Sequence, residues 1–131
     1  MRKIVFRGKT VDGGAWIRGH FVEMEGLPCI FNNGMAVRVV PDTVGQFTGL
    51  YDRNGKEIFE GDIVNAKVIE NRMSGTRKYT DVYEVAYHPK FCYFYLKKEG
   101  NNLLFDGNWS YGVTIEEVIG VINDNPELIE R

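Results

Sequence analysis

Short stretches in which apolar and polar residues alternate follow one another along most of this chain. Alternation with a period of two places successive side chains on opposite faces of a β-strand. No long stretch repeats its apolar residues with the 3.6-residue period of an amphipathic helix. The expected strands cover residues 3–8, 15–24, 29–31, 36–40, 46–51, 57–59, 63–68, 79–87, 91–97, 103–105 and 118–122. The pattern therefore predicts a mainly β protein.

Glycine and asparagine mark the turns between these strands. The strongest turn signal is Asn54-Gly55, because this pair adopts the left-handed conformations that a two-residue hairpin turn demands. A second bend is expected at Glu60-Gly61-Asp62, where glycine tolerates the strained backbone and aspartate bonds nearby amides. Asp52 stands at the start of the hairpin turn. We interpret Asp52 and Asp62 as residues that bend the backbone.

Three segments depart from the strand pattern. Residues 41–43 predict a single helical turn with Asp42 or Thr43 as its cap. Residues 114–117, Thr-Ile-Glu-Glu, fit a capping box and predict another helical turn. Residues 70–78 are polar and aperiodic, so they predict a mobile loop tip.

The order of these elements predicts two parts. Residues 1–45 are expected to form a small N-terminal antiparallel β subdomain. Residues 46–131 hold about five strands, one long polar loop and one helical turn, a set that fits a small, strongly bent SH3-like barrel. A chain of 131 residues has the size of a domain with an appended subdomain.

The composition and charge of the chain make some classes of function less plausible than others. The net charge of −2 argues against a large sequence-independent nucleic-acid surface, which needs clustered Lys and Arg. The charge is uneven, however: the first strand is basic at Arg2, Lys3, Arg7 and Lys9, and the end is acidic at Glu116, Glu117, Asp124, Glu127 and Glu130. Two solvated edges explain this pattern, and head-to-tail self-association is the alternative.

The cysteines and the N-terminus bear on the compartment. Cys29 and Cys92 lie in no CxxC pattern, so neither a zinc site nor a disulfide framework is expected. The first residues contain no long apolar segment of a secretion signal, and no apolar run approaches the length of a membrane span. We expect a cytoplasmic protein with free thiols, no cofactor and no membrane partner.

Four pieces of the sequence together carry a family resemblance. They are Phe6-Arg-Gly-Lys9 followed by Gly14-Ala-Trp16 and Gly19-His20, then Thr43-Val-Gly-Gln-Phe-Thr-Gly-Leu50, then Asp52-Arg-Asn-Gly-Lys-Glu-Ile-Phe-Glu-Gly-Asp-Ile-Val64, and finally Glu117-Val-Ile-Gly-Val-Ile-Asn-Asp-Asn-Pro-Glu-Leu128. In these pieces the chain resembles the YopX family of bacteriophage and prophage proteins. Ala15 departs from the charged residue that the family often carries there. The resemblance implies a C-terminal SH3-like barrel, a phage or prophage origin and action inside a bacterial host. The resemblance does not imply a mechanism or catalytic residues.

Several residue types could carry chemistry, but each has a simpler interpretation. His20 and His88 have no Cys, Asp or Glu at ligand spacing on their own strands, so solvated or core histidines are favoured. The acidic side chains Asp52, Glu57, Glu60 and Asp62 invite an acid–base or metal role, yet turn geometry explains the two aspartates without it. Cys92 has no adjacent basic residue to lower its pKa.

Aromatic side chains give the best functional lead. Tyr79, Tyr83 and Tyr87 share parity on one expected strand, and Phe91, Tyr93 and Tyr95 share parity on the next, whereas Cys92, Phe94 and Leu96 look like core residues. A tyrosine face flanked by Arg77, Lys78, Lys97 and Lys98 suits base stacking or peptide docking. The alternative is that the N-terminal part covers this face. The predicted contact residues are Tyr83, Tyr93, Tyr95, Arg77 and Lys97.

These observations predict a non-enzymatic binding module. Its partner is an unknown protein or nucleic acid of phage or host, and the acidic balance leans towards protein. Two alternatives stay open: a self-assembling structural protein that forms homo-oligomers, and an enzyme or metal site at the acidic residues of the signature segment.

Overall fold

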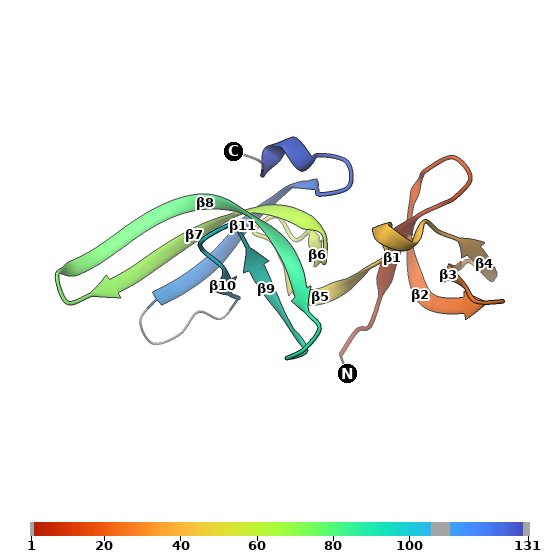
Figure 1. The fold of residues 1–131 in the computed structure, drawn as a ribbon, viewed down its shortest axis with the longest axis horizontal. Coiled ribbons are helices and arrows are strands. Elements are labelled where there is room, and N and C mark those ends of the chain that lie inside the picture. The colour runs from red at the N-terminus through yellow and green to blue at the C-terminus, as the bar shows by residue number, and fades with distance from the viewer. Residues whose placement is uncertain (1, 106–110, 130–131) are drawn as a thin grey trace. The chain divides into compact units, whose positions relative to one another are not determined.

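The chain folds almost entirely into antiparallel β-strands. The computed structural model describes residues 2–105 and 111–129, and among them the helical elements are two single turns of 3-10 helix. The prediction of a mainly β protein is confirmed. The chain divides into two compact units, Met1–Leu50 and Tyr51–Arg131, whereas the sequence placed the division after residue 45. Figure 1 shows the elements of both units.

The first unit is a small antiparallel sheet. Its elements are β1 (Phe6–Lys9), β2 (Trp16–Met24), β3 (Leu27–Asn32), β4 (Met35–Arg38), the 3-10 turn η1 (Pro41–Thr43) and β5 (Gly45–Tyr51), which ends one residue past the unit. In the sheet these strands follow the order β4-β3-β2-β1-β5. The first two strands, both expected from the sequence, pair as an antiparallel hairpin.

Residues just after β4 return to pair with the end of β1. Thr10 and Val39 form an antiparallel bridge, and the Val40 N–H donates to the carbonyl of Lys9 over 2.8 Å. On its other side Val39 donates to the carbonyl of Pro28, which belongs to β3. Val39 is buried there, as are Val5, Cys29, Ile30 and Phe47 of the same unit.

The η1 turn forms where it was predicted but is not capped as predicted. The residue at its N-cap is Val40, and no side chain provides a cap hydrogen bond. Thr43 instead donates its hydroxyl to the carbonyl of Val40 over 2.6 Å and accepts the N–H of Lys9 over 2.9 Å. The threonine therefore ties the turn to β1.

The second unit is built on a five-stranded sheet. Its elements are β6 (Glu57–Phe59), β7 (Asp62–Arg72), β8 (Gly75–His88), β9 (Tyr93–Lys97), β10 (Leu103–Leu104), β11 (Tyr111–Val121) and the 3-10 turn η2 (Pro126–Leu128). The sheet order is β10-β9-β8-β7-β11, and all its pairs are antiparallel. Val64, Ala66 and Val68, which belong to the strand expected at 63–68, lie in the core of this unit and are fully buried together with Ile58, Tyr83, Val85 and Leu96.

The predicted loop at residues 70–78 is wrong. Strands β7 and β8 continue through this segment, with Arg72 opposite Gly75, so that Met73 and Ser74 make a two-residue turn. Nearly all side chains at this end of the hairpin are exposed. Because neither face is buried there, the strands carry no apolar alternation, and ladder pairing alone extends them (Figure 1).

The predicted helical turn at residues 114–117 is also wrong. These residues lie inside β11, where Thr114 pairs with Lys67 of β7. Irregularities between Ile115 and Glu117, and between Val118 and Gly120, break the alternation that would have marked a strand. A neighbouring strand therefore outweighs a four-residue capping pattern.

Two further predictions concern the thiols and the membrane. Cys29 and Cys92 are both free, the first buried and the second exposed. In the part of the chain that the structure describes, no helix combines the length and apolar character needed to cross a bilayer.

Candidate functional site

Asp52 organises the turn that follows β5. Its Oδ1 accepts the backbone N–H groups of Asn54 and Lys56, each over 2.9 Å, and its Oδ2 accepts the N–H of Val118 over 3.0 Å. The residue is 6% exposed. Burial alone would raise the pKa of this carboxyl, but the three backbone donors lower it by more. The ionised carboxylate is therefore held as a structural anion.

Asp62 has a comparable role at the next bend. Its Oδ2 accepts the N–H of Phe59 over 2.7 Å, while Gly61 adopts a φ of 93° that favours glycine. The N–H of Gly61 donates to the carbonyl of Val85 over 2.8 Å. The prediction that Asp52 and Asp62 bond backbone amides at bends is confirmed. Over residues 2–105 and 111–129, no three His, Cys, Asp or Glu side chains gather in a way that could hold a metal ion.

The tyrosines of β8 and β9 do not form one face. Residues directly opposite each other in an antiparallel pair share a face, and here Ala86 pairs with Tyr95 and His88 pairs with Tyr93. Tyr93 and Tyr95 therefore lie on the face of the even-numbered β8 residues. Tyr83 lies on the opposite face, so the predicted joint tyrosine face is wrong.

Tyr83 is a core residue and not a surface contact. Its side chain is 0% exposed, and its hydroxyl accepts a hydrogen bond from the Asn101 amide over 3.3 Å. The same amide nitrogen lies 3.4 Å from the Tyr79 hydroxyl. Burial, with smaller contributions from neighbours such as Tyr79, raises the pKa of Tyr83. The prediction that Tyr83 touches a partner is corrected, because no solvent reaches it.

Arg77 is separated from the other predicted contact residues. It pairs with Glu70 near the far end of the β7–β8 hairpin, and its guanidinium lies 4.6 Å from the centre of the Tyr79 ring. Lys97 pairs with Glu84 and shares its face with Tyr95. Of the five predicted contact residues, the structure brings together Tyr93, Tyr95 and Lys97.

The predicted core set of β9 is correct in part. Leu96 is fully buried opposite Val85, and the Phe94 ring meets the Tyr87 ring edge-on at 5.1 Å. Cys92 is exposed, because it precedes the strand in a turn with a φ of 57°. The left-handed backbone at Cys92 therefore takes it out of the alternation.

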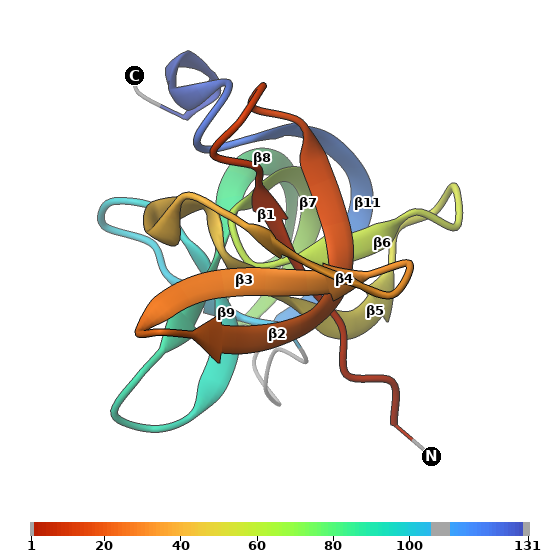
Figure 2. The same cartoon turned by 90° about the vertical axis from the view of Figure 1, so that its right-hand side faces the viewer.

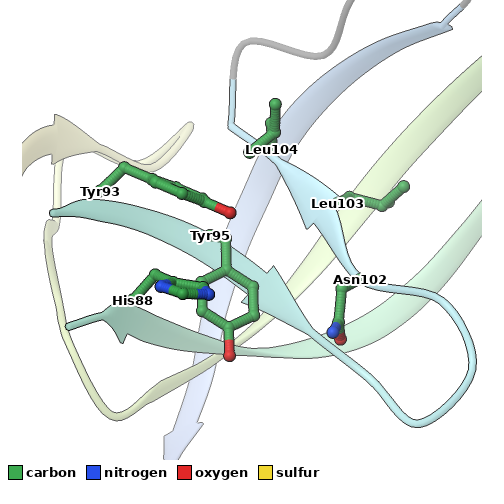
Figure 3. A pocket seen from close by; sticks show the side chains of 6 residues that line it. All are labelled: His88, Tyr93, Tyr95, Asn102, Leu103 and Leu104. Atoms are coloured by element: carbon green, nitrogen blue, oxygen red, sulfur yellow. The ribbon is translucent and has the colours of Figure 1, made fainter. Parts of the chain in front are cut away.

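The Tyr93 and Tyr95 rings line a pocket together with His88. The rings of His88 and Tyr93 stack with centres 5.3 Å apart and planes 16° apart, and Tyr95 lies 6.1 Å from each. They bound a cavity of about 420 Å³ whose lining residues come from three neighbouring strands and one turn: His88, Tyr93, Tyr95, Asn102, Leu103 and Leu104. Figure 3 shows the rings of Tyr93, Tyr95 and His88 on one side of the pocket and the two residues of β10 on the other, with the Leu103 side chain pointing away from the rings. We call this cavity the His88 pocket.

The turn between β8 and β9 sets the histidine in place. The N–H of Cys92 donates to the His88 carbonyl over 2.8 Å, and the N–H of Phe91 donates to His88 Nδ1 over 3.3 Å. On the other side of the pocket, Asn102 Oδ1 accepts the N–H of Lys98 over 3.0 Å and closes the turn before β10. Two turns with internal side-chain hydrogen bonds therefore frame the pocket.

Comparison with known proteins identifies the family. The model of the family described as YopX protein matches residues 20–130. This chain belongs to the YopX family. No curated protein matches it significantly. Among solved structures it is similar to the crystal structure of protein EF1440 from Enterococcus faecalis, with a TM-score of 0.55 and 23% identity over 99% of this chain and 100% of that chain. At this identity the similarity shows a shared fold.

Sequence reasoning missed four residues of the pocket in this YopX-family chain: His88, Asn102, Leu103 and Leu104. The sequence did contain one indication for His88. A short turn at Pro89–Cys92 places His88, the residue before the turn, opposite Tyr93, the first residue of the next strand. The β10 residues could not be placed, because two strand residues carry no periodicity. In this YopX-family chain the pocket offers ring faces and the Leu104 side chain together with polar groups of its lining residues, a set that suits an aromatic group able to form a hydrogen bond.

Proposed function

We propose that this YopX-family protein is a non-enzymatic binding module whose His88 pocket receives an aromatic or large aliphatic side chain of a partner protein. The observation that carries the proposal is the stacked His88–Tyr93 pair, which together with Tyr95 and the partly exposed Leu104 bounds an open cavity. Ring faces and leucine methyl groups gain contact area when an apolar side chain displaces water between them.

The size of the cavity supports a single side chain with part of its flanking backbone. At about 420 Å³ it lies at the small end of the range of roughly 300–1,000 Å³ for ligand pockets. Accessible apolar side chains lie at or beside its rim: Phe91 is 63% exposed, Leu104 41% and Tyr93 37%. Clustered exposed apolar residues of this kind mark interaction sites, and buried aromatic anchors carry most of the energy of protein interfaces.

Charge favours a protein over a nucleic acid at this pocket. Residues 51–131 carry ten Lys and Arg against fourteen Asp and Glu. A phosphate backbone would meet a unit of like net charge, which opposes association. A neutral or basic segment of a partner protein meets no such barrier.

The acidic residues of the signature segment support a non-enzymatic role. The oxygens of Asp52 already accept three backbone N–H groups, and Asp62 bonds Phe59 at a bend. Acid–base chemistry would need a carboxyl that is able to exchange its proton near neutral pH, whereas the lowered pKa of Asp52 keeps it ionised.

Family membership extends the proposal in three respects. We infer that the strands of the second unit correspond to the SH3-like barrel that the family resemblance implies. We infer also that the protein comes from a phage or prophage and acts in the cytoplasm of the bacterial host. Its partner would then be a phage or host protein present in that compartment.

Site-specific crosslinking tests the proposed function. A benzoylphenylalanine placed at Leu104, on the rim of the pocket, should crosslink one protein in host cells, and the same residue at Lys78 should not. The partner, once identified and purified, should bind the wild-type protein and lose at least tenfold in affinity for Tyr93→Ala/Tyr95→Ala. Equal affinity for the two proteins would refute the proposal.

A further inference from the structure

The first unit gathers cations and aromatic rings on one face of its sheet. Cα partners in an antiparallel pair lie on the same face. In the β1–β2 pair, Lys9 is opposite Trp16 and Arg7 is opposite Arg18, with no irregularity in the register. These four side chains therefore project to one side of the sheet.

The next two strands continue this face. His20 lies two residues beyond Arg18 on β2 and pairs with Phe31 of β3. Cys29, two residues from Phe31, pairs with Arg38 of β4. Because side chains alternate between the two faces of a strand, these residues of β1, β2, β3 and β4 all lie on the same face of the sheet. Figure 2 shows β2 and β3 side by side. We call it the basic–aromatic face and define it by Arg7, Lys9, Trp16, Arg18, Phe31 and Arg38.

The strands of this face place no acidic side chain on it. Strands β1 to β4, all of whose residues the structure describes, contain a single acidic residue, Glu23. It pairs with Pro28 and so projects from the opposite side of the sheet. Residues 1–50 carry six Lys and Arg against four Asp and Glu, which reverses the sign found in residues 51–131. The whole-chain charge of −2 hides this difference.

The two aromatic rings of the face, Phe31 and Trp16, differ in how exposed they are. Phe31 is 45% exposed, and its neighbours His20, Arg18 and Arg38 are exposed as well. Trp16 is half-buried, with the Arg7 guanidinium 4.9 Å and the Lys9 ammonium 5.6 Å from its ring centre. One ring is therefore open for stacking, and the other holds two cations in fixed positions at the edge of the face.

We propose that the basic–aromatic face binds single-stranded nucleic acid. Proteins that bind single strands combine cations that follow the phosphates with aromatic rings on which unpaired bases stack. Here Phe31 supplies the stacking platform. Arg18 and Arg38 lie on either side of it, and Arg7 and Lys9 extend the positive charge along β1. Base-paired strands hide the faces of their bases, so the face selects single strands. This site lies on different residues from the His88 pocket and does not depend on it.

Fluorescence anisotropy with the full chain tests this proposal. The probes are labelled oligo-dT and oligo-rU of twenty nucleotides and a duplex of the same length. Binding of dT or rU that is tighter than binding of the duplex supports the proposal, and the stronger of the two identifies the natural class. With four phosphate contacts, raising the salt from 50 to 200 mM should weaken single-strand binding by roughly fiftyfold.

Paired variants separate stacking from charge. Phe31→Ala should weaken single-strand binding at least about fivefold with little change in its salt dependence. Arg18→Ala/Arg38→Ala should weaken binding and reduce the salt dependence, whereas the charge-matched Arg77→Ala/Lys78→Ala should change neither. All these residues are exposed, and far-UV circular dichroism verifies the fold of each variant.

The outcomes that overturn the proposal are distinct from those that test the His88 pocket. No binding of either single strand, equal binding of the duplex, or an unchanged affinity in Phe31→Ala and Arg18→Ala/Arg38→Ala would each overturn it. Tyr93→Ala/Tyr95→Ala should bind single strands as the wild type does. Loss of binding in that variant would place the site elsewhere and would equally overturn the proposal.

Discussion

The carboxylate of Asp52 accepts a hydrogen bond from the backbone N–H of Val118, 66 residues further along the chain. The bond reaches β11 at the residue where the register with β7 becomes irregular. Next to it, the N–H of Arg53 donates to the carbonyl of Glu116 over 2.9 Å. One side chain therefore shapes its own turn and fixes a distant strand to it.

Replacing Asp52 should destabilise the second unit. In Asp52→Ala the N–H groups of Asn54, Lys56 and Val118 lose their acceptor, and each loss in a buried setting costs about 1–3 kcal/mol. We expect the free energy of unfolding to fall by about 3 kcal/mol in urea titrations. Asp12→Ala, in an exposed turn, is the matched control and should change stability by less than about 0.5 kcal/mol. A loss as small as that of the control would contradict the structural role of Asp52.

The same carboxylate predicts a pH dependence. Its pKa lies below the ordinary value of 3.8 in the folded protein, since backbone donors outweigh the effect of burial. The stabilisation is therefore fully present above that ordinary value and is lost as the pH falls through the lowered folded pKa. The difference in unfolding free energy between the wild type and Asp52→Asn should shrink between about pH 5 and pH 2. A difference that stays constant over this range would show that the ionised form is not favoured by folding.

Tyr83 should ionise only when the second unit unfolds. Burial raises its pKa, so folding favours the neutral phenol, and the associated stability is present below the ordinary pKa of 10 and falls above it. Ultraviolet titration of Tyr83→Phe should show the loss of a phenol that appears only in the unfolding transition. Tyr83→Phe should cost about 1 kcal/mol through the lost hydrogen bond to Asn101. Tyr93→Phe, which changes an exposed tyrosine on the opposite face of the sheet, is the control and should change the free energy of unfolding by less than about 0.5 kcal/mol.

Gly19 should tolerate no side chain. A Cβ atom at this position would lie 2.2 Å from the carbonyl oxygen of Phe31, so β2 and β3 would have to separate. We expect Gly19→Ala to destabilise the first unit by about 2 kcal/mol, within the range for overpacked positions. Gly112→Ala, where no neighbouring atom lies within 4 Å, is the control. Thermal unfolding of both variants measures the effect, and equal midpoints would mean that the strands yield without cost.

The sequence predicted those elements whose causes are local. The strand β6 and the bend at Gly61-Asp62 follow from the backbone preferences of their own residues, and the structure has both. A turn also lies at Asn54-Gly55, but not in the predicted two-residue form: Gly55 alone of this pair has a positive φ, and its N–H donates to the carbonyl of Asp52. Residues 70–78 and 114–117 were assigned wrongly because their conformation comes from a partner strand. The residues of one segment do not show which other strand will pair with it.

The candidate site was predictable within one strand but not across two. Parity correctly joined Tyr93 and Tyr95, which share β9, whereas Phe91, the third residue of the predicted set, lies in the turn before the strand. It could not tell which face of β8 they adjoin, because a shift of one residue in the turn at 89–92 exchanges the faces. In the structure the turn at 89–92, which contains the left-handed Cys92, pairs His88 with Tyr93, so the β9 tyrosines lie on the face opposite Tyr83. The Gly19 contact and the acid-free face of β1 to β4 likewise need the pairing of strands.

The measurement that tests the account most directly is an NMR titration of the ¹⁵N-labelled full chain with N-acetyltryptophanamide. If the His88 pocket receives aromatic side chains, amide signals around His88, Tyr93 and Leu104 should shift in a saturable manner. The same titration of Tyr93→Ala/Tyr95→Ala should leave those signals in place. Absence of shifts in the wild-type protein, or equal shifts in the variant, would contradict the assignment of this pocket as the binding site.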